Sequence, residues 1–240
     1  MIGQRTCTLR AAGIASRGTS GYNWGIGHAV TPWRRDKDYR SFHAPLEADV
    51  NRLVSFTQMK DGTREDYLLL EQTEREFATR LPERILGALR DLNHSVEGYP
   101  LTRLGHSLQT ATRARRDGAD DDLVVGALIH DIGDLLAPCN HAQIAAAIIR
   151  PYVREQVTWI VEQHELFQTY YFAHHTGGDR YARERLREHR WYESCVDFCE
   201  RYDQSSFDPA YRTMSLAEFE PLLRQIFGRV PYDPRYTAPA

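Results

Sequence analysis

Histidine and aspartate side by side in an apolar segment are the first sign of chemistry in this chain. His130 and Asp131 lie in the middle of residues 123–136, which we predict to form a buried helix because most of their side chains are apolar. An ionised carboxylate in such a core must be paired, protonated or bound to a metal ion. For an isolated pair, a buried hydrogen bond between the two side chains would be a sufficient explanation.

The pair is not isolated, because other predicted helices carry further residues of the same types. These are His106, His141, His164 and Asp203. Neutral imidazoles and carboxylates are ligands for iron, zinc and similar ions, and a helical bundle can bring them together from different helices. Six such groups are too many for one simple four-ligand site. We therefore predict a site for two metal ions, which Asp131 can bridge through its two carboxylate oxygens.

Helices are predicted to position these residues, since apolar residues recur at helical spacing and no segment alternates as a strand would. The predicted helices cover about residues 63–70 and beyond, 82–92, 102–116, 123–136, 141–150, 151–171, 181–203 (as one or two helices) and 216–227. Thr63, Thr102 and Asn140 can cap three of them, and Pro151 suits the first turn of another. The predicted fold class is all-α.

Composition narrows the function classes. The net charge is −3 and the mean hydropathy is −0.55, so we expect neither a nucleic-acid partner nor a membrane span, and a cytoplasmic location. Residues 1–35 contain arginines but no Asp or Glu, so we interpret residues 1–45 as a loosely attached arm, with organelle targeting as the alternative. Residues 46–230 are the predicted bundle, and residues 231–240 an extended tail. The oligomeric state is left open.

Two runs of residues carry a resemblance to a known family. Leu104-Gly-His106-Ser-Leu-Gln109-Thr-Ala and Leu128-Ile-His130-Asp131-Ile-Gly resemble the HD-domain superfamily. The full order of ligand-type residues is similar to its binuclear members, and the surroundings of Gln109 and Asp203 are similar to the mixed-valent diiron oxygenases. Those enzymes are myo-inositol oxygenase and the organophosphonate-cleaving oxygenases. The resemblance covers roughly residues 46–227 and implies an HD-domain helical bundle.

The resemblance also implies a cofactor and a reaction. It implies two iron ions, Fe2+ and Fe3+, that use O2 to oxidise or cleave a C–H, C–C or C–heteroatom bond of a small polar substrate. His106, His130, Asp131 and Asp203 would hold one iron, and His141 and His164 the other, with Asp131 as the bridge. The metal ions rather than an acid–base side chain would perform the difficult step.

Several positions beside these ligands depart from the family pattern. Asp134 stands where the oxygenases have lysine or histidine, Gln168 where the phosphonate enzymes have lysine, and Glu200 where they have arginine. These departures argue against a phosphonate and lead to the hypothesis of a cationic or polyhydroxy substrate. Asp134 could instead orient a ligand histidine from behind.

Further residues are candidates for the substrate pocket. They are Gln109, Gln204, His174 and Tyr99. In the phosphonate enzymes a Tyr-x-x-Glu element gates the iron, and Glu97-Gly-Tyr99-Pro is only loosely similar to it. Tyr99 could therefore be a gate and Glu97 a temporary ligand, or both could belong to a plain loop. His174 could line the pocket or be a solvated residue.

The main competing function is that of an HD phosphohydrolase acting on a phosphate ester or a nucleotide through water activated by Mn2+, Mg2+ or Zn2+. Its binuclear forms use much the same ligands, so the ligands alone do not distinguish a phosphohydrolase from an oxygenase. Phosphate substrates usually require Arg or Lys near the metals, and the positions beside the ligands favour the oxygenase. Arg103, Arg113, Arg150 and Arg201 remain candidate phosphate clamps. A metal-stabilised domain without catalysis is the third alternative, although structural zinc sites use fewer ligands.

Overall fold

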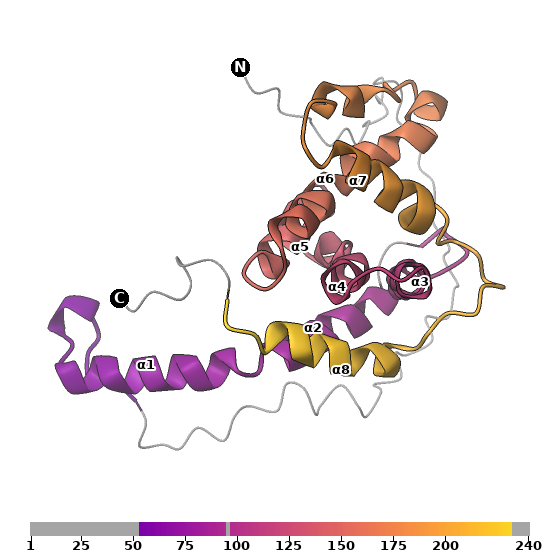
Figure 1. Cartoon of the computed structure of the whole chain (residues 1–240). Coiled ribbons are helices and arrows are strands. Elements are labelled where there is room, and N and C mark those ends of the chain that lie inside the picture. Colours follow the sequence, from indigo (N-terminus) through magenta and orange to yellow (C-terminus); the bar gives the residue numbers. More distant parts are fainter. Residues whose placement is uncertain (1–52, 95–96, 232–240) are drawn as a thin grey trace, which may run out of the picture. The chain divides into compact units, whose positions relative to one another are not determined.

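The computed structural model of the chain describes residues 53–94 and 97–231, so the predicted arm and residues 232–240 of the predicted tail lie outside the described residues. The chain divides into two units after Arg52, and the described residues all belong to the second, Leu53–Ala240. They contain helices and no strand (Figure 1), which confirms the all-α prediction. None of the described helices has the length and apolarity that crossing a bilayer requires.

Eight α-helices make up most of the described structure: α1 (Arg64–Ala78), α2 (Leu81–Asp91), α3 (Arg103–Arg116), α4 (Asp121–Ile129), α5 (His141–Ile149), α6 (Glu155–Phe172), α7 (Tyr192–Phe198) and α8 (Leu216–Phe227). Short 3-10 turns precede or connect them: η2 (Met59–Asp61) before α1, and η3 (Leu92–His94), η4 (Ile132–Leu135), η5 (Ala173–Thr176) and η6 (Ala182–Leu186) between helices. One π-helical turn, η7 (Cys199–Asp203), continues α7.

Local capping explains where several helices begin. The Thr63 hydroxyl accepts from the backbone N–H of Asp66, and the Thr102 hydroxyl accepts from that of Gly105, as their sequence positions predict. Two expectations are wrong in detail. Asn140 precedes α5 but makes no side-chain cap, and α6 begins only at Glu155 because a turn comes after Pro151.

The core lies around α3 and α4, which are seen nearly end-on in Figure 1 between α2 and α8 on one side and α5, α6 and α7 on the other. Every residue from Val124 to Ile129 is buried. A Cβ on Gly126 would lie 2.6 Å from Cγ1 of Val157, so the missing side chain lets α4 approach α6 closely. This approach brings the end of α4 beside the histidine that α6 carries.

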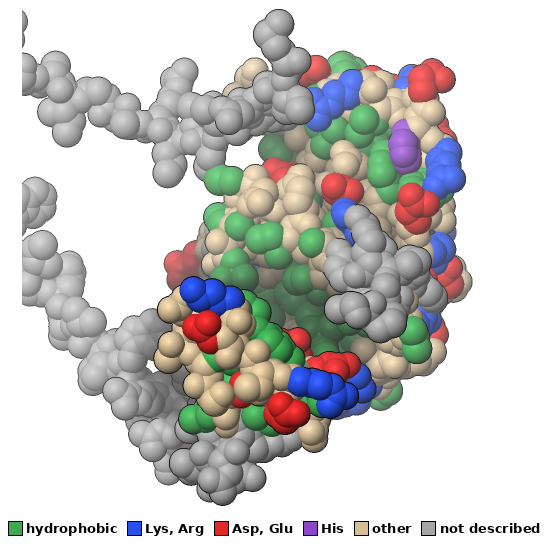
Figure 2. Space-filling model, turned by 90° about the vertical axis from the view of Figure 1, so that its left-hand side faces the viewer, with side chains coloured by type: hydrophobic (Ala, Val, Ile, Leu, Met, Phe, Trp, Pro, Cys, Tyr) green, Lys and Arg blue, Asp and Glu red, His purple; other side chains and the backbone are tan. Residues whose placement is uncertain are grey.

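The first helix of the unit differs from the others in burial. Asp66 is the only residue of α1 that is buried, whereas Leu68 and Phe77 are exposed. Figure 2 shows hydrophobic side chains on the face of the molecule that carries α1. The residues that must position the ligand-type side chains therefore lie in α3 to η7 rather than in α1.

Asp66 gives a prediction about pH. Its carboxylate accepts hydrogen bonds from the backbone N–H groups of Thr63 (2.9 Å) and Ser55 (2.7 Å), which lower its pKa to about 2. A carboxyl whose pKa is lowered by folding stabilises the fold above its unfolded pKa, and that stability is lost as the pH falls through the folded pKa. We expect Asp66→Asn to lower the melting temperature at neutral pH, and the difference to vanish between about pH 4 and about pH 2.

Thermal unfolding followed by circular dichroism over this pH range measures the effect. Glu65→Gln, in the same helical turn, removes the same charge and is the matched control, for which we expect a smaller change. A loss in Asp66→Asn that is the same at all pH values would contradict the prediction.

Candidate metal centre

The residues predicted as ligands converge inside the bundle. His106 lies on α3, His130 and Asp131 follow α4, His141 begins α5, His164 lies on α6, and Asp203 ends η7. All are at most 4% exposed except the half-buried His141. Groups of these side chains, joined by Asp134, have ligand atoms within 4.8 Å of one another and could hold metal ions.

The His130-Asp131 pair lies at a helix end, and the prediction of one helix over residues 123–136 is wrong. Helix α4 ends at Ile129, and a 3-10 turn begins at Ile132. The reason is the close approach of Gly133 to the start of α5, where a Cβ would lie 2.6 Å from the backbone oxygen of His141. A continued α4 could not place these backbones together, so the turn at Asp131 is what brings His141 to the pair.

All four ligand-type histidines have one ring nitrogen bound to the backbone. Their Nδ1 atoms contact the carbonyl oxygens of Ser206 (3.0 Å), Ala127 (2.8 Å), Pro138 (3.2 Å) and Val161 (2.7 Å), for His106, His130, His141 and His164 respectively. A carbonyl can only accept, so each Nδ1 carries the proton and each neutral ring presents a lone pair at Nε2. This is the arrangement by which proteins orient histidines as metal ligands.

The four Nε2 atoms meet in two pairs. Those of His106 and His130 lie 3.1 Å apart, and those of His141 and His164 lie 3.3 Å apart. Two lone pairs facing each other at this distance repel unless a cation lies between them. The geometry therefore fits one cation at each pair. We call the side of His106, His130 and Asp203 the first half, and the side of His141 and His164 the second half.

Asp131 presents one oxygen to each half. Its Oδ2 lies 3.6 Å from Nε2 of His106 and 3.4 Å from that of His130, while its Oδ1 lies 3.3 Å from Nε2 of both His141 and His164. Asp203 adds Oδ1 to the first half, at 3.1 Å from Nε2 of His106. The first half thus has one more protein ligand than the second, which leaves the second half more open to an external ligand.

The two buried carboxylates of this cluster, Asp131 and Asp203, favour cations beside them. Burial alone would raise the pKa of Asp131 and of Asp203, but the surrounding imidazoles lower both well below their ordinary values. The two carboxylates in turn raise the pKa of His106 and His130 against the effect of burial. Oδ2 of Asp203 is buried without a hydrogen-bond partner in the described part of the chain. An orphaned carboxylate oxygen beside converging lone pairs fits a metal site.

Asp134 lies behind the second half. Its Oδ1 is 3.3 Å from Nδ1 of His141, so it supports the ring that also contacts the Pro138 carbonyl. Its Oδ2 is 2.8 Å from Nε of Arg103. Burial and the neighbouring Asp131 raise the pKa of Asp134, against the effect of Arg103. This position supports the interpretation of Asp134 as an orienting residue.

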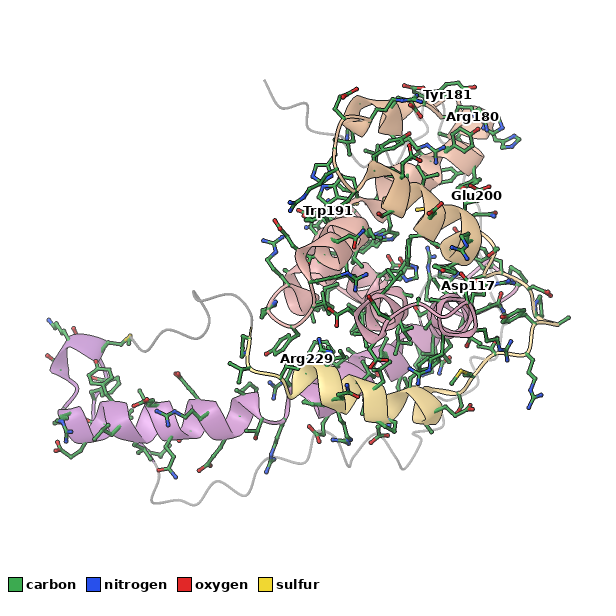
Figure 3. All side chains as sticks on the ribbon, in the orientation of Figure 1. Asp117, Arg180, Tyr181, Trp191, Glu200 and Arg229 are labelled. Carbon is green, nitrogen blue, oxygen red and sulfur yellow. The ribbon has the colours of Figure 1, made fainter. Side chains whose placement is uncertain are left out.

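The other predicted pocket residues lie in diverse surroundings. The buried Gln109 amide donates a hydrogen bond to the backbone carbonyl of Asp208 and accepts one from the backbone N–H of the same residue. Gln168 is half-buried one turn beyond His164, while Gln204 is half-buried and donates to the Glu200 carbonyl. Glu200 is exposed near the start of η7 (Figure 3), and the exposed His174 ring lies against that of His175. Tyr99 is 49% exposed, and its ring stacks on that of Phe207, which in turn stacks on the ring of His106.

Two contacts of the cluster were not predicted. Nη1 of Arg103 lies 3.2 Å from Oδ2 of Asp131, and the Phe207 ring stacks between those of His106 and Tyr99. Arg103 precedes His106 by one helical turn, and this spacing could have indicated a shared face. Phe207 comes from a loop after η7, and its contact with His106 depends on tertiary structure alone.

Surface hollows do not coincide with this cluster. One of about 680 Å³ is lined by Trp159, His189 and Trp191 among others, and Figure 3 labels Trp191. Another of about 260 Å³ is lined by arginines and by Tyr211. None of the six ligand-type residues lines either hollow. The candidate centre is therefore identified by its chemistry rather than by cavity volume.

Comparison with known proteins agrees with this geometry. Residues 103–203 match the family described as HD domain, an interval that contains all six ligand-type residues. A [1-hydroxy-2-(trimethylamino)ethyl]phosphonate dioxygenase (glycine-betaine-forming) from Leisingera caerulea is 29% identical over 87 residues, which are 32% of this chain and 44% of that protein. The match thus spans less than half the length of the relative. The candidate centre therefore lies in the part of the chain that is similar to an HD domain.

Proposed function

We propose that this chain is an HD-domain oxygenase that holds two iron ions and uses O2 to oxidise or cleave a bond of a small polar substrate. The observation that carries the proposal is the convergence of four Nε2 lone pairs around Asp131, whose two oxygens face opposite halves. One carboxylate that serves both halves supports a centre of two coupled ions rather than two separate sites. The similarity to the dioxygenase from Leisingera caerulea supports iron and O2 over other chemistries.

Each half of the centre would hold one ion, the first half together with Oδ2 of Asp131 and the second half together with Oδ1. The bound iron would supply the activation of O2. The backbone carbonyls keep every ligand ring turned toward the ions, and Asp134 holds His141 in the same orientation. Burial excludes bulk water from the first half, which protects a reactive centre from side reactions.

One observation keeps the metal-dependent phosphohydrolase as a second candidate. Neutral and acidic residues beside the ligands disfavour it in the sequence, but the Arg103 guanidinium contacts Asp131 and Asp134. The same contact weakens the reason for a cationic or polyhydroxy substrate. That hypothesis remains a proposal, and it predicts faster turnover of amino or polyhydroxy compounds than of phosphonates.

Metal analysis and spectroscopy test the proposal. We expect protein purified without oxygen to contain about two iron ions per chain, and partial oxidation to produce a mixed-valent electron paramagnetic resonance signal. A protein that retains Zn2+, Mn2+ or Mg2+ and hydrolyses phosphate esters would overturn the oxygenase in favour of the second candidate. The double variant His106→Ala/His164→Ala, which removes one imidazole from each half, is the control for adventitious metal.

A further inference from the structure

A surface hollow outside the candidate centre is lined mainly by arginine and tyrosine. It has a volume of about 260 Å³ and lies where the end of α3 packs beside η7. Its lining residues are Arg113, Arg116, Asp117, Arg201, Tyr202 and Tyr211. No ligand-type residue of the centre is among them. The hollow therefore gathers three positive charges and one negative charge at a place that the proposed function does not use.

The one carboxylate of this hollow is already engaged. Asp117, which Figure 3 labels, pairs with the guanidinium of Arg201 and accepts a hydrogen bond from the Tyr202 hydroxyl at 2.6 Å. Its negative charge offsets that of Arg201. The positive charges of Arg113 and Arg116 are therefore left without a counter-charge in the hollow.

Arg113 and Arg116 lie against the same aromatic ring instead of a carboxylate. Their guanidinium carbons are 4.0 Å and 5.1 Å from the centre of the Tyr211 ring, and neither forms an ion pair in the described part of the chain. The Glu218 carboxylate is engaged elsewhere, because the backbone N–H and the hydroxyl of Ser215 donate to it and, more than the charge of Arg116, lower its pKa. Nε of Arg113 is buried and has no hydrogen-bond partner among the described residues.

The end of a helix attracts cations, but this attraction does not explain the hollow. The free carbonyl groups at the end of α3 carry partial negative charge, which favours arginine there. Arg115 lies in the same turn, yet it pairs with Asp121 at 3.3 Å and does not line the hollow. Arg113 and Arg116 lie instead beside Arg201 of another element. Like charges held together in this way repel one another, and an anion among them would remove that cost.

Charge and size favour a phosphoryl group as this anion. A phosphate monoester carries a charge of about −1.5 to −2 at pH 7, which matches two guanidinium groups without a counter-charge. Its oxygens point in several directions, so arginines of α3 and of η7 can donate to it together, whereas a carboxylate offers two oxygens in one plane. A hollow of about 260 Å³ holds such a group with a small substituent.

We propose that this hollow binds the phosphoryl group of a small phosphate monoester, at a site separate from the metal centre. Arg113 and Arg116 donate to phosphoryl oxygens from α3, and Arg201 donates from η7. Tyr211 is a positioning residue, because its ring lies against both guanidinium groups of α3. Arg113 and Arg201 are two of the arginines that the sequence offers as phosphate clamps, and the structure places both at this hollow. The inference does not depend on which ions the centre holds.

Isothermal titration of the full chain tests this inference without measuring turnover. The probes are methyl phosphate, inorganic phosphate and, as the planar anion with one charge, acetate. We expect both phosphates to bind more tightly than acetate. The double variant Arg113→Gln/Arg116→Gln should weaken phosphate binding by roughly tenfold or more, because charge-assisted hydrogen bonds are lost. Arg115→Gln removes a charge from the same turn of α3 outside the hollow, and it should bind phosphate as the wild type does.

A further variant distinguishes this site from the metal ions, to which phosphate could also bind. The His106→Ala/His164→Ala chain lacks one imidazole in each half of the centre, and it should bind methyl phosphate as tightly as the wild type does. Binding that is lost in this chain but kept in Arg113→Gln/Arg116→Gln would place the anion at the metals and overturn the inference. An equal loss in Arg115→Gln would indicate a general effect of charge and would also overturn it.

Milder variants give a result even if the double arginine variant folds poorly. Arg116 is exposed, so Arg116→Gln should keep the melting temperature and still weaken phosphate binding. Tyr211→Leu should weaken the binding as well, whereas Tyr211→Phe keeps the ring that supports the guanidinium groups and should bind normally. A wild-type chain that binds neither phosphate would overturn the inference and leave the proposed function standing.

Discussion

Asp131→Asn is expected to remove both ions from the centre, whereas His141→Ala should remove only one. The reason is that Asp131 gives Oδ2 to the first half and Oδ1 to the second, while the His141 ring contacts the second half alone. Asparagine keeps the shape of the side chain but loses the charge and replaces one oxygen by a donor nitrogen. That nitrogen would face imidazole lone pairs or a cation, and neither half could use it as a ligand.

Metal content after dialysis against a weak chelator measures this effect. We expect about two ions per wild-type chain, about one for His141→Ala and well below one for Asp131→Asn. Asp134→Asn is the matched control, because it removes the charge of another buried carboxyl close by that contacts a ligand ring only from behind. It should keep the first ion and weaken the second by roughly 10- to 100-fold. An Asp131→Asn chain that keeps both ions would rule out the bridge.

The parts of this structure that depend on local signals could be predicted. Helix α8 has the predicted bounds, residues 216–227, because its apolar spacing recurs every helical turn. Thr63 and Thr102 cap helices as predicted, because an N-cap acts within three residues of itself. The ligand-type residues were recognisable for a similar reason, since an ionisable side chain inside an apolar helix needs a partner wherever that helix packs.

The contacts that depend on distant segments could not be predicted. Gln109 was expected to face a substrate, yet its amide is bound to the backbone of Asp208, 99 residues away. Arg103 could be singled out only as one of several arginines, because its contact with Asp131 spans 28 residues and a helix boundary. Periodicity describes which face of a helix is apolar, but it does not describe which loop covers that face.

The break between α4 and η4 is the most consequential of these tertiary effects. Residues 123–136 have the composition of one continuous helix, and the sequence therefore predicts one. The chain turns at Asp131 instead, where Gly133 packs against the backbone of His141. In the sequence Gly133 stands out only as part of a family motif, but its lack of a side chain is what allows the second half of the centre to form.

Gly133→Ala is therefore expected to have the second large effect. The new Cβ would lie 2.6 Å from the backbone oxygen of His141 and 2.8 Å from its Cα. Backbone atoms cannot rotate away, so η4 or the start of α5 must move. Overpacking of this kind costs about 1–3 kcal/mol of stability. Because the displaced residue is itself a ligand, we expect weaker metal binding in the second half and little change in the first.

Gly126→Ala separates the packing effect from the effect on the ligand. Its Cβ would lie 2.6 Å from a side-chain methyl of Val157 rather than from backbone, and alanine is the better helix former. Unfolding in urea should therefore show a smaller loss of stability for Gly126→Ala than for Gly133→Ala. Metal titration should show two ions retained in Gly126→Ala, and a second ion bound more weakly only in Gly133→Ala. Equal loss of the second ion in both variants would mean that general loosening of the core, and not the position of His141, controls metal binding.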